Sequence, residues 1–238
     1  MEFLRLLAAF VLFLASFVRA QTAVDPSGHW EGAIQIPNME MKIEIDLTTN
    51  DKGELAGTFG QSAQGVKGLP LSTVGIDGRS VRFVFKGTEG PATFEGVLSA
   101  DGQSIAGEVT QGTYTVPFKL ARTGDARIAR PPKSASIGKE LEGTWTGTVE
   151  ADGRQMRLVV KMANQPDGTA SGTIMSPDGS GVEIPIAMTQ KGSTLTIDVT
   201  QVGSSYVGVL NDAGTELVGT YTQGPVSGPL TLKHEIKR

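Results

Sequence analysis

The chain has few side chains that could carry out covalent chemistry. It contains no cysteine and only two histidines, His29 and His234. A serine nucleophile needs a base close to it. The nearest approach to a nucleophile elbow, Gly60-Gln61-Ser62-Ala63-Gln64, lacks the final glycine of that motif. We therefore expect no catalytic residues, and a hydrolase is the function that the sequence favours least.

The carboxylates are equally unpromising as a reactive or metal-binding group. Most fall in turns or at outward strand positions, and Asp51, Asp101, Asp167 and Asp178 lie in loops. Aspartate-rich loops bind hard cations such as calcium, but no Asp-x-Asp-x-Asp-Gly spacing occurs in the chain. We expect no metal, no cofactor and no carboxylate pair of the glycosidase kind.

Inward-facing aromatic residues are the better candidates for a function. They are either core side chains or the lining of a small-molecule site, which is mostly apolar with a few directed polar groups. In the second half of the chain, Tyr206 and Tyr221 would add hydroxyls and Gln223 an amide to such a lining. A Gln-Gly pair equally suits a turn, which is the alternative explanation for the two glutamines. The candidate ligand-binding residues are Trp145, Tyr206, Tyr221, Gln223, Trp30, Phe94 and Gln111.

The strongest pattern in the sequence is a tandem duplication. Gly28-His29-Trp30-Glu31-Gly32 recurs 115 residues later as Gly143-Thr144-Trp145-Thr146-Gly147, and later matches occur at an offset of 112. The repeat predicts two modules, residues 28–122 and 143–236. Residues 123–142, stiffened by Pro131-Pro132, match neither copy and are expected to form a linker.

Each module shows short runs of alternating apolar and polar residues separated by Asp-Gly and Asn-Asp turns. We count eight strands per module, with one weak strand over residues 69–74. Consecutive antiparallel strands with one apolar face must close to cover it, and eight strands close into a small barrel. The predicted fold is all-β, two tandem eight-stranded antiparallel meander barrels. Outward charges such as Lys42, Glu44 and Arg157 exclude a membrane barrel.

The start of the chain has the pattern of a secretory signal peptide over residues 1–20, with an apolar run too short to span a bilayer. We therefore expect a secreted or periplasmic bacterial protein without a membrane span after cleavage. A disulfide-free chain must rely on its cores for stability. The net charge of −4 gives no basic face, so nucleic acid is not an expected partner.

The Gly-x-Trp motifs that open both modules, Gly28-x-Trp30 and Gly143-x-Trp145, resemble the start of the calycin barrels, the superfamily of lipocalins and avidin. In lipocalins the tryptophan closes one barrel end beneath an arginine of the last strand. The resemblance implies that role for Arg122 in the first module. His234 stands at the corresponding place in the second module, which is a departure from the pattern.

A second resemblance covers most of both modules. The segments 156–160, 172–178, 184–186, 204–210 and 219–224 resemble a non-catalytic β module found ahead of secreted bacterial α/β-hydrolases. It implies an accessory role without catalytic residues. Two non-enzymatic functions follow: a barrel lumen that binds a small apolar or amphipathic molecule, or a scaffold that docks a secreted hydrolase or an envelope protein.

Overall fold

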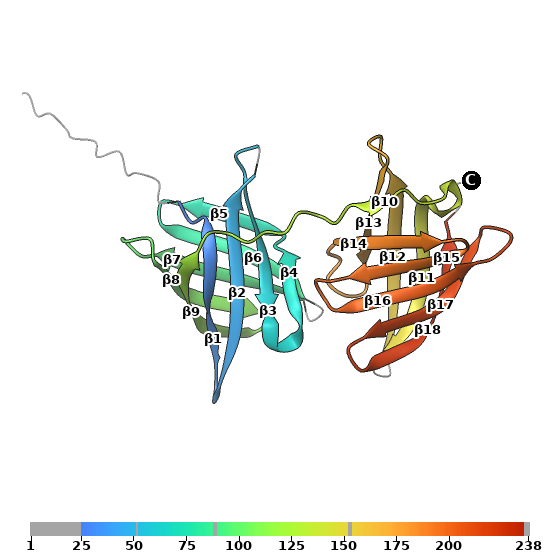
Figure 1. The fold of residues 1–238 in the computed structure, drawn as a ribbon. Coiled ribbons are helices and arrows are strands. Elements are labelled where there is room, and N and C mark those ends of the chain that lie inside the picture. The colour runs from blue at the N-terminus through green and yellow to red at the C-terminus, as the bar shows by residue number, and fades with distance from the viewer. Residues whose placement is uncertain (1–24, 51, 88–89, 152–153, 236–238) are drawn as a thin grey trace, which may run out of the picture.

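The computed structural model describes residues 25–50, 52–87, 90–151 and 154–235, so the expected signal peptide lies outside the described residues. These residues form two curled antiparallel sheets in succession along the chain (Figure 1). The all-β class and the tandem barrels are confirmed. Within the described residues, no helix is both long and apolar enough to span a membrane.

The first sheet is a meander of nine strands in the order β4-β3-β2-β1-β9-β8-β7-β6-β5. A short 3₁₀ turn, η1 (Ser62–Gln64), lies between β3 and β4. The strands are β1 (Gly28–Ile36), β2 (Met39–Thr49), β3 (Leu55–Gln61), β4 (Val66–Pro70), β5 (Thr73–Asp77), β6 (Ser80–Gly87), β7 (Gly90–Leu98), β8 (Ser104–Gln111) and β9 (Tyr114–Gly124).

The second sheet closes fully, because β13 pairs with both β12 and β14. A 3₁₀ turn, η2 (Lys139–Leu141), precedes the barrel. The strands are β10 (Ser134–Ala135), β11 (Gly143–Ala151), β12 (Arg154–Asn164), β13 (Thr169–Met175), β14 (Ile184–Lys191), β15 (Thr194–Val199), β16 (Ser204–Leu210), β17 (Glu216–Gln223) and β18 (Val226–His234).

The strand predicted over residues 69–74 is two strands, β4 and β5, which together correspond to β14. Thr58 pairs with Pro70 in the first barrel as Thr173 pairs with Pro185 in the second. After Pro70 the chain changes partner: the Leu71 N–H donates to Gly57 O on β3, and the Ser72 N–H donates to Val84 O on β6. These two single hydrogen bonds bring the edges of the first sheet together, but among the described residues no strand pairing closes it, so it remains a curled half-barrel beside the closed second barrel.

The expected linker, residues 123–142, divides into three parts. Strand β9 continues to Gly124, and the part after residue 133 packs on the second barrel, where β10 pairs with β13 and Ile137 and Leu141 are buried. Only residues 125–133 connect the barrels, and they cross the outer face of β1 and β2 (Figure 1). Ile137 and Leu141 lie among small and charged residues. The composition of the segment therefore did not predict that these two side chains are buried.

Each barrel is closed at one end by its tryptophan. The indole N–H of Trp30 donates to Pro26 O and that of Trp145 to Leu141 O, both at 2.9 Å. The Arg122 guanidinium lies over Trp30, with its carbon 4.6 Å from the ring centroid. The His234 ring stacks on Trp145 at 4.4 Å. Different last-strand residues thus cover the same indole face in the two barrels.

Paired glycines allow the sheets to curl. Gly96 faces Gly107 across β7 and β8, and Gly208 faces Gly219 across β16 and β17. A Cβ atom on Gly107 would overlap the Glu95 carbonyl oxygen, and one on Gly219 would overlap that of Val207. No side chain of any kind fits at these two positions, so the tight curvature of the sheet requires glycine there.

Large aromatic rings fill the space that the glycines leave. In the first barrel the Phe118 ring lies over Gly96, and in the second the Tyr206 ring lies over Gly208. Phe118 also packs against the edges of Phe83 and Phe94. The Tyr206 hydroxyl donates to Leu217 O at 2.8 Å, inside the core. The two barrels therefore fill corresponding spaces with rings from different strands: Phe118 belongs to β9, and Tyr206 belongs to β16.

We expect Gly107→Ala to lower the free energy of unfolding of the first barrel by about 2–4 kcal/mol, because the new methyl group overlaps backbone atoms. Gly75→Ala on β5 is the matched control, since a Cβ there meets nothing within 4 Å. Urea unfolding followed by tryptophan fluorescence measures both variants, as each barrel holds one of the two tryptophans. Equal stabilities of the two variants would contradict this account of the curvature.

A second prediction concerns alkaline pH. Burial raises the pKa of Tyr206 above its ordinary value of 10.0. The unfolded chain therefore releases this proton first, and stability falls as the pH rises above about 10. Tyr206→Phe should lose about 1 kcal/mol at neutral pH with its hydrogen bond, and its stability should fall less steeply above pH 10. Parallel stability curves for the variant and the parent would show that Tyr206 does not carry this effect.

Candidate functional site

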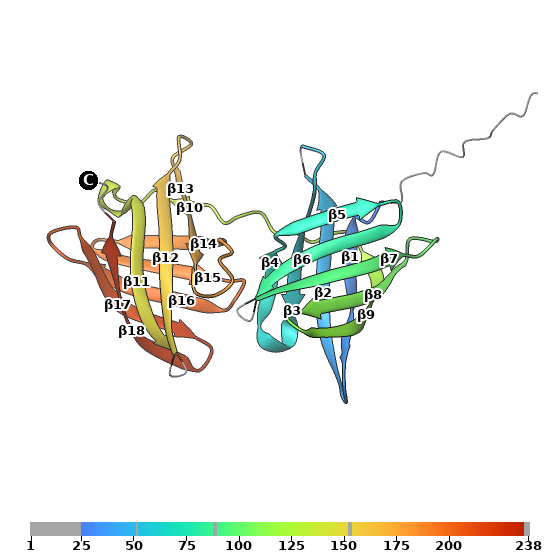
Figure 2. The ribbon, with the colours of Figure 1, turned by 180° about the vertical axis from the view of Figure 1, so that it is seen from behind.

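A cavity of about 310 Å³ lies between the two barrels and is lined by both. Its apolar wall is built from duplicated positions: Phe59 and Ile174 on β3 and β13, Leu69 and Ile184 on β4 and β14, and Phe85 and Val199 on β6 and β15. The two barrels therefore turn the same end toward each other. Figure 2 shows β3 and β4 of the first barrel beside β14–β16 of the second.

A backbone hydrogen bond joins the barrels at this point. The Lys67 N–H donates to Gln201 O at 2.8 Å. Residues on either side of it alternate: Val66 and Val202 line the apolar cavity, whereas Lys67 and Gln201 line a separate polar one. Val66 and Lys67 are successive residues of β4, whose side chains point in opposite directions, and Gln201 and Val202 lie in the turn after β15, so the two segments separate the two cavities.

Two rings stiffen the part of the cavity that belongs to the first barrel. Phe59 and Phe85 stack with their centroids 4.2 Å apart. Phe59 is 5% exposed. A stacked aromatic pair presents a flat apolar surface, which suits contact with a hydrocarbon.

Polar atoms are few in the cavity and come mainly from the second barrel. The Tyr221 hydroxyl donates to Gln223 Oε1 at 2.9 Å, and Gln223 Nε2 donates to Val202 O at 3.3 Å. Burial raises the pKa of Tyr221, and a hydrogen bond with Ser204 opposes that shift. Tyr221 is therefore neutral at physiological pH, and its hydroxyl is oriented by a fixed amide.

One buried hydroxyl in the lining is left without a partner. Ser176 Oγ, which follows β13, is inaccessible and forms no hydrogen bond with any residue that the structure describes. An unsatisfied buried hydroxyl costs about 1–3 kcal/mol of stability.

The structure places two of the seven predicted site residues, Tyr221 and Gln223, on the cavity. Trp30, Phe94 and Trp145 have no exposed surface and pack within the barrels. Tyr206 is also buried, with its hydroxyl bonded to backbone, and Gln111 Nε2 donates to Gly90 O at 3.3 Å. The candidate site thus lies at the barrel mouths, and those five residues support the barrels behind it.

Most lining residues were not singled out from the sequence. Phe59, Leu69, Phe85 and their counterparts are not among the predicted site residues, because no sequence signal distinguishes a position at the barrel mouth from a core position. Their recurrence in both copies is the signal that could have found them. When two related barrels face each other with the same end, corresponding residues of the two copies line the cavity between them.

The second cavity, of about 410 Å³, is polar and lies beneath the linker. His29 Nδ1 is 2.8 Å from Asp46 Oδ1, its Nε2 is 3.2 Å from Glu31 Oε1, and the Arg127 N–H donates to Asp46. The histidine and aspartate are buried, so this network fastens the linker to β1 and β2. No serine or threonine hydroxyl bonds to the His29 ring among the described residues, and no group of three metal ligands occurs in them.

No protein-family model matches the chain, and no curated protein is significantly similar to it. Among solved structures, a "putative outer membrane protein" of Bacteroides fragilis is 11% identical, with a TM-score of 0.30 over 88% of this chain and 97% of that one. A protein of unknown function from the DUF3598 family of Nostoc punctiforme is 12% identical, with a TM-score of 0.27 over 91% and 98%. Similarities this low support no conclusion about function.

Proposed function

We propose that this protein is a secreted or periplasmic, non-enzymatic binding protein that holds a small apolar or amphipathic molecule between its two barrels. The observation that carries the proposal is the shared cavity of about 310 Å³, whose apolar wall comes from corresponding positions of both modules. This volume lies at the lower end of the range for small-molecule sites. The ligand would be buried at the barrel mouths instead of in a single lumen.

The chemistry of the lining supports binding without a reaction. Aliphatic and aromatic side chains dominate the wall, and the polar groups are neutral amides and hydroxyls apart from Lys86. Each methylene buried in such a site contributes about 0.8 kcal/mol, or roughly a fourfold change in Kd. Affinity should therefore follow the apolar length of the ligand until the cavity is full.

A scaffold function is the alternative, and one surface favours it. Val207, Val209 and Val218 lie on the outer face of β16 and β17 and are 48%, 50% and 54% exposed. Val209 and Val218 are cross-strand partners, so these three residues form one outer apolar face. Such a face could dock a secreted hydrolase or an envelope protein, as the second sequence resemblance implies.

We expect the neutral dye N-phenyl-1-naphthylamine to bind saturably with blue-shifted emission, and n-alcohols to displace it with a Kd that falls about fourfold for each added methylene. Val182→Trp should weaken the binding of the dye and of the alcohols by at least about tenfold. Val182 lies on a loop that lines the cavity, and the larger tryptophan ring would fill that cavity. Fluorescence titration of the full chain measures these effects.

Val218→Trp on the outer face is the matched control, since it adds the same ring where 54% of the side chain is already exposed. It should leave the affinities unchanged. Dye binding that is weakened by Val218→Trp and not by Val182→Trp would move the ligand site to the outer face. Absence of saturable binding in the parent protein would favour the scaffold function.

A further inference from the structure

The cavity between the barrels carries one positive charge. Lys86, near the end of β6, is the only lysine, arginine, aspartate or glutamate among the described residues that line it. Its neighbour Phe85 belongs to the stacked aromatic wall. The sequence places Lys86 among outward strand charges, but the approach of the second barrel brings it to the edge of an apolar site.

This lysine has no anionic partner within the described part of the chain. Lysine and arginine side chains form five ion pairs there, and none includes Lys86. Other strand charges do have partners: Arg82 on the same strand pairs with Glu95, and Lys161 on β12 pairs with Glu183. Within the described residues, no carboxylate competes with a ligand for the positive charge at the cavity.

A cation at the edge of an apolar space selects a particular class of molecule. Charge pairs gain strength as water is displaced from around them. A hydrocarbon chain buried in the cavity displaces water beside Lys86, so an anionic group at the end of that chain would be paired in a partly dry environment. A cationic head group would meet an uncompensated like charge at the same place.

We propose that the ligand is a single-chain amphiphile with a carboxylate head. Its hydrocarbon chain packs against Phe59, Phe85 and the corresponding aliphatic residues of the second barrel, and its carboxylate pairs with Lys86 Nζ. This assignment rests on the proposed function, because it names the class of molecule that the same cavity takes.

The test compares three ligands that each carry a ten-carbon alkyl chain, by their displacement of the neutral dye from the full chain: decanoate, decanol and decyltrimethylammonium. The parent protein should bind decanoate at least about tenfold more tightly than decanol, and the cationic ligand least. Lys86→Gln should abolish the preference for decanoate over decanol. Lys86→Glu should reverse the order of the two charged ligands.

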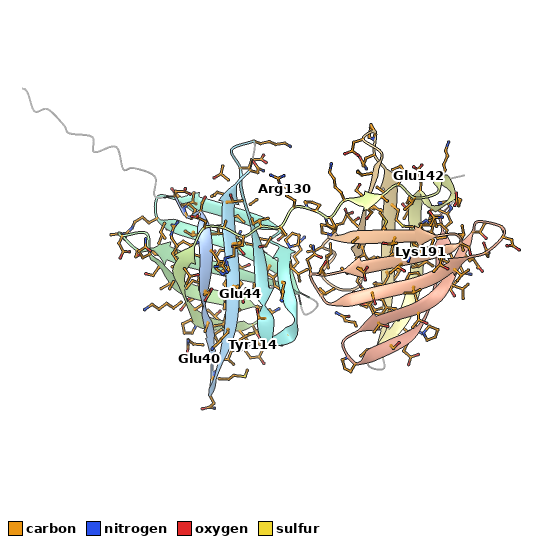
Figure 3. All side chains as sticks on the ribbon, viewed as in Figure 1. Glu40, Glu44, Tyr114, Arg130, Glu142 and Lys191 are labelled. Atoms are coloured by element: carbon orange, nitrogen blue, oxygen red, sulfur yellow. The ribbon has the colours of Figure 1, made fainter. Side chains whose placement is uncertain are left out.

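Lys191→Gln is the matched control, because Lys191 is an exposed strand-end lysine of the second barrel outside the cavity lining (Figure 3). It should keep the full preference for decanoate. Equal affinities for decanoate and decanol in the parent would overturn the carboxylate assignment, and so would a preference for decanoate that survives in Lys86→Gln. In either case, binding of decanol would still support the proposed function. Failure of all three ligands to displace the dye would overturn both.

Discussion

The close approach of two backbones at paired glycines is the constraint on which the molecule depends. Where Gly96 faces Gly107 and Gly208 faces Gly219, a carbonyl oxygen of the neighbouring strand occupies the place of a side chain. The sheet can curl sharply there, and its apolar face becomes an interior instead of a surface. A flatter sheet would leave that face open to water, and neither Trp30 nor Trp145 would be buried.

Tight curvature also decides where a ligand can be held. A narrow barrel leaves a narrow interior, and Phe118 and Tyr206 already fill the space over the glycines. The tryptophan ends are closed by Arg122 and His234. The cavity large enough for a small molecule therefore lies at the barrel ends opposite the tryptophans. It is enclosed because these two ends meet across the Lys67–Gln201 hydrogen bond.

The fold was largely predictable from the sequence, because alternation and turn residues act locally. The duplicated Gly-x-Trp motif, the alternation and the Asp-Gly turns predicted meander barrels, and β1, β2 and β11 lie close to their predicted positions. The prediction failed where distant contacts decide the outcome. The strand over residues 69–74 changes partner after Pro70, and Ile137 and Leu141 pack on the second barrel from within the expected linker. Less of the candidate site was predictable: Tyr221 and Gln223 line the cavity, but Phe59 and Lys86 line it only because the second barrel lies against the first, which no local pattern reveals.

The joining of two like halves in one chain has a consequence for specificity. A pair of separate identical barrels meeting mouth to mouth would present every lining residue twice, so any head-group contact would be mirrored across the cavity. Covalent fusion removes that symmetry: each half can diverge on its own, and Tyr221 with Gln223 on one side faces Phe85 with Lys86 on the other. A cavity between two diverged repeats can thus distinguish the two ends of an elongated ligand and hold it in one orientation.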